Sequence, residues 1–160
     1  MITSFDDAFA KICGIEGDYS DNPADPGGPT RYGIKQSVAR AHGYTGDMRN
    51  LPFDLAKRIA KSEYWDKFQC DQFDPRIGYL VFDAAYNGGH PIQWLQAAVK
   101  VTVDGIIGAQ TVAAVRSVDS MHVMVLFNAA HLRYYASLKN CVMDDGWMNR
   151  VAFNLEVAAS

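Results

Sequence analysis

The chain has 160 residues, of which 49% are hydrophobic and 21% are charged, a composition that is ordinary for a globular protein with one buried core. The formal net charge is −3 and the basic residues form no run, which argues against a nucleic-acid-binding protein that neutralises phosphates. The chain has no apolar stretch long enough to predict insertion into a membrane, and its first fifteen residues lack the features of a secretory signal. We therefore expect one compact unit over residues 1–160, synthesised and kept in the cytoplasm.

The first predicted element is an amphipathic helix that ends at Glu16. Ser4 followed by Asp7 matches a capping box at its start, and glycines at positions 14 and 17 stop it. This placement puts Glu16 where the backbone turns outward, beside apolar side chains that would raise its pKa and keep a proton available near neutral pH. Glu16 is therefore a candidate general acid. The residues that form the apolar face are Phe5, Ala8, Phe9, Ile12 and Cys13.

A loop rich in glycine, proline and aspartate follows and is predicted to form tight turns or a small hairpin. Asp25 lies nine residues after Glu16, and Thr30 follows five residues later. An inverting glycosidase needs a carboxylic acid and a carboxylate base roughly 6.5 to 9.5 Å apart, with a water molecule between the base and the sugar. Glu16 and Asp25 would supply that pair, and Thr30 would hold the water. The alternative is that Asp25 caps a turn and Thr30 bonds the backbone.

The run IEGDYSDNPADPGGPTRYGI resembles the N-terminal signature of the glycoside hydrolase family 108 muramidases. In that family a Glu-Gly-Gly-Tyr element precedes Asp-Pro-Gly-Gly and Thr-x-Tyr-Gly-Ile elements. The resemblance implies that Glu16 is the catalytic acid and that Asp25 and Thr30 match the aligned Asp and Thr. Asp18 stands where the family pattern has its second glycine, so Asp18 and Asp21 are further candidates for the second carboxylate.

The resemblance extends over nearly the whole chain. The stretches SEYWDKF, FDAAYNGG and DGWMNR look like later elements of the family, and WLQAAVKVTVDGIIGAQTVAAV is similar to its peptidoglycan-binding type of region. The resemblance implies a catalytic signature region over 1–90 and a helical region of the peptidoglycan-binding type over 91–160, packed on it.

The remaining elements are predicted to be helices. Pro52, Pro75 and Pro91 stand where first helical turns should begin, with Asp74 as a cap for the second of these helices. The result is a mainly α, lysozyme-like helical fold with one small β-hairpin element near residues 19–33. The helices are expected over residues 52–65, 75–86, 91–100, 109–117, 120–138 and 145–158.

Five further residues are candidates for contacts with a glycan. Tyr19 and Tyr32 flank the acidic loop, and their rings would stack on sugars. Tyr86, Asn87 and Gly88 end a predicted helix, where an amide and exposed backbone would hydrogen-bond N-acetyl groups. The alternative for most aromatic residues, the tryptophans above all, is a place in the core.

Other polar residues are given structural roles. Asp83 is predicted to be a buried hydrogen-bonding partner and not a catalyst. The four histidines show no paired ligand spacing, and the DGIIG turn lacks the lysine of a phosphate-binding loop. We therefore expect no metal and no cofactor.

The resemblance implies a peptidoglycan hydrolase that cleaves the β-1,4 bond between N-acetylmuramic acid and N-acetylglucosamine. We expect a phage-type endolysin that acts as a monomer on peptidoglycan strands, reaching the wall in the periplasm through a holin pore or a secretion route. A family branch that assists toxin or protein export is an alternative role. Two alternatives in chemistry stay open: a lytic transglycosylase, which would use a single Glu and the substrate's own 6-hydroxyl, and a non-catalytic protein that binds peptidoglycan.

Overall fold

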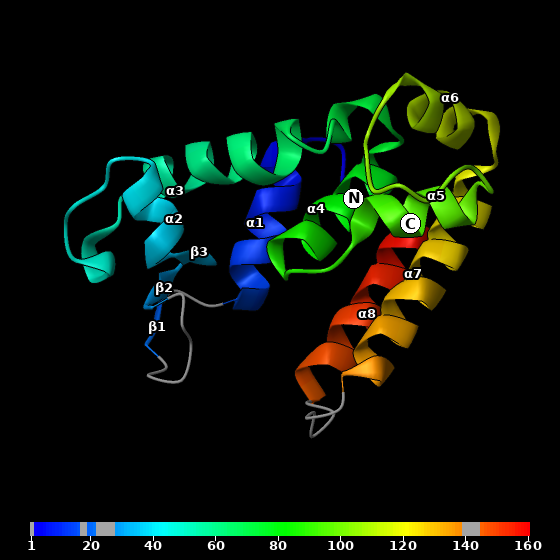
Figure 1. The fold of residues 1–160 in the computed structure, drawn as a ribbon. Coiled ribbons are helices and arrows are strands. Elements are labelled where there is room, and N and C mark those ends of the chain that lie inside the picture. The colour runs from blue at the N-terminus through cyan, green and yellow to red at the C-terminus, as the bar shows by residue number, and fades with distance from the viewer. Residues whose placement is uncertain (1, 17–18, 22–27, 139–144) are drawn as a thin grey trace. The chain divides into compact units, whose positions relative to one another are not determined.

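The computed structural model describes residues 2–16, 19–21, 28–138 and 145–160. It is mainly helical with one small antiparallel sheet, which confirms the predicted lysozyme-like fold class (Figure 1). The chain divides into two compact units, Ser4–Lys67 and Phe68–Ser160, the latter with the first three residues of the chain. The predicted division of function between residues 1–90 and 91–160 stays a prediction.

The Ser4–Lys67 unit begins with the predicted helix, α1 (Phe5–Glu16). Ser4 Oγ accepts the backbone N–H of Asp7 at 3.2 Å and donates to the Asp7 carboxylate at 3.1 Å, so the predicted cap is confirmed. The apolar face is buried at Phe5, Ala8, Phe9 and Ile12. The later elements are β1 (Tyr19–Ser20), β2 (Thr30–Arg31), β3 (Ile34–Lys35), α2 (Gln36–Ala41), the 3-10 helix η1 (Met48–Asn50), α3 (Phe53–Ala60) and the π-helix η2 (Lys61–Asp66).

Helices α3 and η2 together fill the helix predicted over 52–65. Pro52 has φ −63° and ψ 137° and precedes the first helical residue, so it is the N-cap and not the first-turn proline that was expected. In η2 the helix widens to a π conformation, which is rare and is found frequently at functional sites. Trp65 on η2 is only 2% exposed and packs edge-on against Phe5, with ring centroids 5.5 Å apart.

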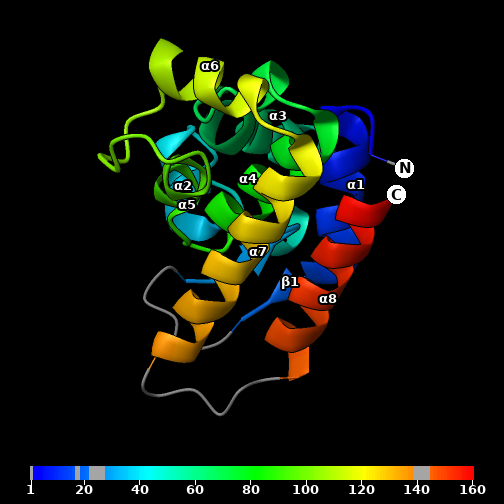
Figure 2. The ribbon, with the colours of Figure 1, turned by 90° about the vertical axis from the view of Figure 1, so that its right-hand side faces the viewer.

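The Phe68–Ser160 unit is built around α4, which packs against α5, α7 and α8. Asp74 caps α4 by accepting the backbone N–H of Arg76 at 2.9 Å, and Pro75 occupies the first turn, as predicted. None of the helices within the described residues is long and apolar enough to cross a membrane. Figure 2 shows α7 and α8 running side by side. The elements are the 3-10 helix η3 (Cys70–Gln72), α4 (Pro75–Tyr86), α5 (Pro91–Ala98), α6 (Ala109–Ser117), α7 (Ser120–Ser137) and α8 (Asp145–Ala159).

A buried side chain fixes the turn between α5 and α6. Gln96 is 1% exposed, and its Nε2 donates to Asp104 Oδ1 at 2.7 Å and to Thr111 Oγ1 at 3.2 Å. Its Oε1 accepts the N–H of Gly105 at 2.9 Å. Gly105 has φ +74°, a left-handed conformation that favours glycine. The bonds from the Ile106 N–H and from Gln96 lower the pKa of Asp104, which keeps this carboxylate ionised as an acceptor.

A buried ion pair joins α4 to α8. Asp83 is fully buried and accepts Arg150 Nε at 2.8 Å and Asn154 Nδ2 at 2.9 Å. Arg150 is also buried, at 8% exposed, so both charges are removed from water together. The prediction that Asp83 is a buried hydrogen-bonding partner is therefore confirmed.

A buried histidine lies in the aromatic core between α5 and α7. The His131 ring stacks on Trp94 with centroids 4.8 Å apart and lies 4.4 Å from the Tyr135 ring. Within the described residues, His131 Nδ1 is buried without a hydrogen-bond partner. Burial, assisted by the Arg150 charge, lowers the pKa of His131 to about 4. The imidazole is therefore neutral at physiological pH.

This histidine predicts a pH dependence of stability. Because the pKa of His131 is about 4 in the folded state and about 6.5 in the unfolded state, the unfolded state binds the extra proton between these values. The free energy of unfolding should therefore fall as pH drops from about 6.5 to 4, by on the order of 3 kcal/mol. His131→Phe should remove this loss and His122→Phe, at an exposed position, should retain it. Urea unfolding at pH 7, 5 and 4 measures both; an unchanged loss in His131→Phe would contradict the assignment.

Candidate active site

The predicted acid stands at the junction of α1 and the sheet. Glu16 is the last residue of α1, and the chain next enters β1. In the sheet Ser20 of β1 pairs with Thr30 of β2, so Thr30 is brought back beside the strand that follows Glu16. The candidate carboxylates Asp18 and Asp25 lie outside the described residues.

The turn between β2 and β3 holds Tyr32 in an unusual conformation. Tyr32 has φ +51° and Gly33 has φ +78°, which is the pattern of a two-residue type I′ hairpin turn. A non-glycine residue in the left-handed region is strained, and such strain is concentrated at functional sites. The Gln36 N–H donates to the Pro29 carbonyl at 2.9 Å and closes the hairpin. The turn thus places Tyr32 two residues from Thr30.

The Tyr32 ring belongs to a small aromatic surface. Arg31 lies over this ring at 4.9 Å, and its Nη2 donates to the Tyr32 hydroxyl at 3.2 Å. Phe53 meets the ring edge-on, with centroids 5.2 Å apart, and is 44% exposed. Phe53 also packs against Phe9 of α1 at 5.5 Å. Sequence reasoning missed Phe53 because an aromatic residue in a helical apolar pattern is usually buried.

Tyr19 lies on β1 within a cluster of charged groups. Its hydroxyl donates to Asp21 Oδ2 at 3.2 Å, and the Arg49 guanidinium lies 5.2 Å from its ring centroid. Desolvation and the hydrogen bond to Asp21 raise the pKa of Tyr19, so the phenol keeps its proton. Asp21, a candidate second carboxylate, is exposed, and its Oδ2 lies 3.9 Å from Arg49 Nη2. Arg49 is a second residue at this site that sequence reasoning missed.

The other predicted glycan contacts lie at the C-terminal end of α4, in the Phe68–Ser160 unit. Asn87 caps the helix: its Nδ2 donates to the Asp83 carbonyl at 2.8 Å. Gly88 has φ +74° and accepts the Tyr134 hydroxyl at 3.5 Å. Tyr86 packs edge-on against Phe82, with centroids 5.3 Å apart. The structure thus groups Tyr86, Asn87 and Gly88 at one helix end. It places Tyr19 and Thr30 on paired strands of one sheet and Tyr32 in the turn that follows β2.

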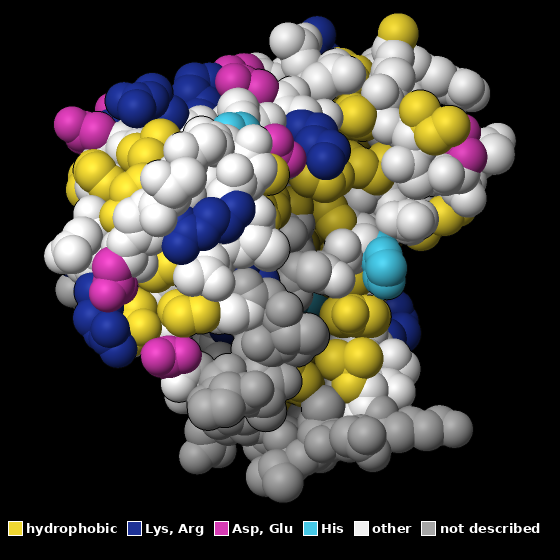
Figure 3. All heavy atoms as spheres, turned by 60° about the vertical axis from the view of Figure 1, so that its left-hand side comes forward, with side chains coloured by type: hydrophobic (Ala, Val, Ile, Leu, Met, Phe, Trp, Pro, Cys, Tyr) yellow, Lys and Arg dark blue, Asp and Glu magenta, His cyan; other side chains and the backbone are white. Residues whose placement is uncertain are grey.

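Neither a metal cluster within the described residues nor a broad area of one charge on the face drawn in Figure 3 is present. In the described ranges, no group of three or more His, Cys, Asp and Glu side chains is placed to hold a metal ion. On the face drawn in Figure 3, basic, acidic and hydrophobic side chains are interspersed.

We expect the Tyr32 ring to contribute to substrate binding. Tyr32→Asn should raise the KM for peptidoglycan roughly tenfold, equivalent to about 1.4 kcal/mol, with kcat little changed. Asn tolerates the left-handed backbone angle, so the turn itself should persist. Tyr32→Phe keeps the ring and should retain a KM close to the parent value. Steady-state kinetics on solubilised peptidoglycan provides the measurement, and an unchanged KM in Tyr32→Asn would exclude the contact.

Two family models and a solved structure match this chain. Residues 9–89, more than half of the chain, match the family model described as Glycosyl hydrolase 108, and residues 90–152 match the Predicted Peptidoglycan domain. The chain is similar to the solved structure of Brucella abortus SagA, with a TM-score of 0.82 and 29% identity over 97% of this chain and 93% of that one. The search of curated proteins gave no match. Together the two family matches support a peptidoglycan hydrolase, and the chain belongs to glycosyl hydrolase family 108.

Proposed function

We propose that this peptidoglycan hydrolase is an N-acetylmuramidase that uses Glu16 as its general acid. The observation that carries the proposal is the position of Glu16 at the end of α1, directly before the sheet that contains Thr30, within the residues that match the glycosyl hydrolase family.

In the proposed reaction Glu16 protonates the glycosidic oxygen between N-acetylmuramic acid and N-acetylglucosamine. Asp25 removes a proton from a water molecule held by Thr30, and the water oxygen attacks the anomeric carbon from the opposite face. The bond from that carbon to the glycosidic oxygen breaks. The products are a reducing N-acetylmuramic acid end, with inverted configuration, and a free 4-hydroxyl on N-acetylglucosamine.

The aromatic groups of the Ser4–Lys67 unit would hold the sugars. Tyr32 and the exposed Phe53 form adjoining rings, and Tyr19 retains a phenol proton that can be donated to a sugar oxygen. Tyr86, Asn87 and Gly88 would contribute hydrogen bonds to N-acetyl groups. Among the described residues the Asn87 Nδ2 already bonds its own helix, so its carbonyl oxygen is the group that would accept an N-acetyl N–H.

Mass spectrometry of purified peptidoglycan digested by the parent chain tests the reaction. Reducing N-acetylmuramic acid ends would support a muramidase. Anhydro ends would instead identify a lytic transglycosylase, in which the 6-hydroxyl of the substrate attacks and Asp25 is dispensable. Retained wall binding with no fragments released would identify a non-catalytic binding protein.

We further propose an endolysin-like role, with synthesis in the cytoplasm and action on the wall in the periplasm. Production of the chain alone should leave cells intact, whereas co-production of a holin should cause lysis. Lysis without any such partner would contradict this placement. Intact cells together with altered protein export would favour the secretion role.

A further inference from the structure

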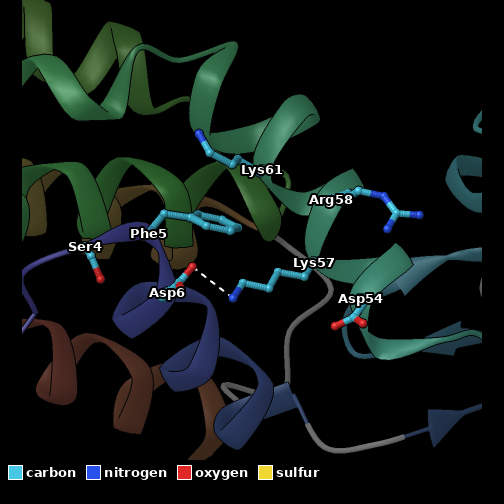
Figure 4. A pocket seen from close by; sticks show the side chains of 7 residues that line it. All are labelled: Ser4, Phe5, Asp6, Asp54, Lys57, Arg58 and Lys61. Carbon is cyan, nitrogen blue, oxygen red and sulfur yellow. Dashed lines mark ion pairs between the residues drawn. The ribbon is translucent and has the colours of Figure 1, made fainter.

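A pocket of about 430 Å3 opens in the Ser4–Lys67 unit at the end of α1 opposite to Glu16 (Figure 4). One side is formed by the start of α1, and the other by α3 and the first residue of η2. None of its residues belongs to the active site described above. The residues that line it are Ser4, Phe5, Asp6, Asp54, Lys57, Arg58 and Lys61.

The pocket combines an apolar wall with charges of both signs. The Phe5 ring faces the pocket in Figure 4, and Lys61 Nζ lies 5.6 Å from its centroid. Lysine and arginine stems add apolar surface beneath their charged ends. Three basic groups and two acidic groups line the pocket, which leaves a surplus of one positive charge among them. This arrangement suits a ligand that carries carboxylates, an ammonium group and small apolar side chains.

Two of these charges are available to a ligand. Lys57 Nζ pairs with Asp6 at 3.0 Å, and Lys61 pairs with Asp66. Arg58 and Asp54, by contrast, are exposed and make no ion pair or hydrogen bond with any residue in the described part of the chain. An arginine fork binds a carboxylate through two parallel hydrogen bonds, and an aspartate accepts from an ammonium group.

The distance from the catalytic end of α1 matches the length of a short peptide. Phe5 and Glu16 are the first and last residues of α1, and eleven steps of about 1.5 Å separate them by about 16 Å. An extended peptide of five residues spans at most about 17 Å. In peptidoglycan a stem peptide of this length is attached to the N-acetylmuramic acid whose glycosidic bond would be cut at Glu16.

We propose that this pocket binds the stem peptide of peptidoglycan. Arg58 takes a carboxylate, Asp54 takes the ammonium group of a diamino acid, and Phe5 packs against alanine methyl groups. This inference rests on the proposed function, because the glycan places the peptide near the pocket. It makes the enzyme selective for strands that still carry their peptides.

Binding of the free peptide tests the pocket without reference to catalysis. Isothermal titration calorimetry with a synthetic stem pentapeptide (L-Ala, γ-linked D-Glu, meso-diaminopimelate, D-Ala, D-Ala) should show a Kd at least tenfold weaker for Arg58→Glu. Arg58→Lys, which keeps the charge, should recover part of the affinity. Lys67→Glu is the matched control, since Lys67 is exposed and lies outside the pocket, and its Kd should change less than twofold. The proposal would be overturned if Arg58→Glu and the parent chain bound the peptide with the same Kd. It would also be overturned if inorganic phosphate displaced the bound peptide as effectively as free peptide does.

Activity on two substrates separates this inference from the proposed function. Arg58→Glu should lower kcat/KM about fivefold on intact peptidoglycan, through KM, and leave it unchanged on glycan strands stripped of peptides by an amidase. Equal loss on both substrates, or on neither, would contradict a peptide site. If the parent chain releases no reducing ends from either substrate, the muramidase proposal fails, while the calorimetry still decides whether the pocket binds the peptide.

Discussion

Glu16→Gln is expected to lower kcat for peptidoglycan cleavage by about 1,000-fold, within the range that a general acid contributes. The amide keeps the size and shape of the carboxyl group but has no acidic proton to give to the leaving oxygen. Substrate contacts made by the sheet should persist, so KM should change little. Release of reducing ends from purified peptidoglycan, followed at several substrate concentrations, measures both constants.

Glu63→Gln provides the control for this substitution. Glu63 lies in the same compact unit on η2 and pairs with His42 at 2.9 Å, so its replacement removes a carboxylate without touching α1. Its kcat should stay within about twofold of the parent value, as for a surface change away from the reacting atoms. Retention of more than a tenth of kcat in Glu16→Gln would assign the proton donor to another residue.

Arg150→Met is expected to lower the free energy of unfolding by about 3 to 5 kcal/mol, the cost of breaking a buried ion pair from one side. The Asp83 carboxylate is fully buried and, among the described residues, would keep only the Asn154 amide as a partner. Because a domain of this size is stable by only about 5 to 15 kcal/mol, the loss should be visible as a large decrease in the urea midpoint. Equilibrium urea unfolding at pH 7 is the measurement.

Two further variants test the cause of this loss. Arg116→Met removes an exposed arginine whose Nε donates to the Gln72 carbonyl at 2.7 Å, and it should cost less than about 1 kcal/mol. Asp83→Asn in the Arg150→Met background removes the uncompensated charge and should recover part of the stability. A double variant less stable than Arg150→Met would show that the carboxylate is not the destabilising group.

The helices of the Phe68–Ser160 unit were predictable because local signals mark both their faces and their starts. Asp74 and Pro75 begin α4, Pro91 begins α5, and both helices are rich in apolar residues. Helix α2 was not predicted because it has six residues and no side-chain cap. The π geometry of η2 was also beyond prediction, since it changes the helix radius without changing the apolar pattern.

The site was predictable only where its residues lie close together in the sequence. The turn residues of TRYGI indicate a hairpin, and the helix end followed by glycine places Glu16. Phe53 and Arg49 join this hairpin through tertiary contacts with Tyr32 and Tyr19. No local pattern encodes contacts between segments that are twenty or thirty residues apart.

The contact between Asp83 and Arg150 determines where the chain can be divided in protein engineering. Asp83 lies within the residues that match the hydrolase family, and Arg150 lies within those that match the peptidoglycan domain. In a chimera joined between residues 89 and 90, the two partners of this buried ion pair would therefore come from different parent proteins. A junction between Lys67 and Phe68 keeps α4 and α8 from the same parent. Chimeras between relatives should fold more often when the donor segment begins before α4.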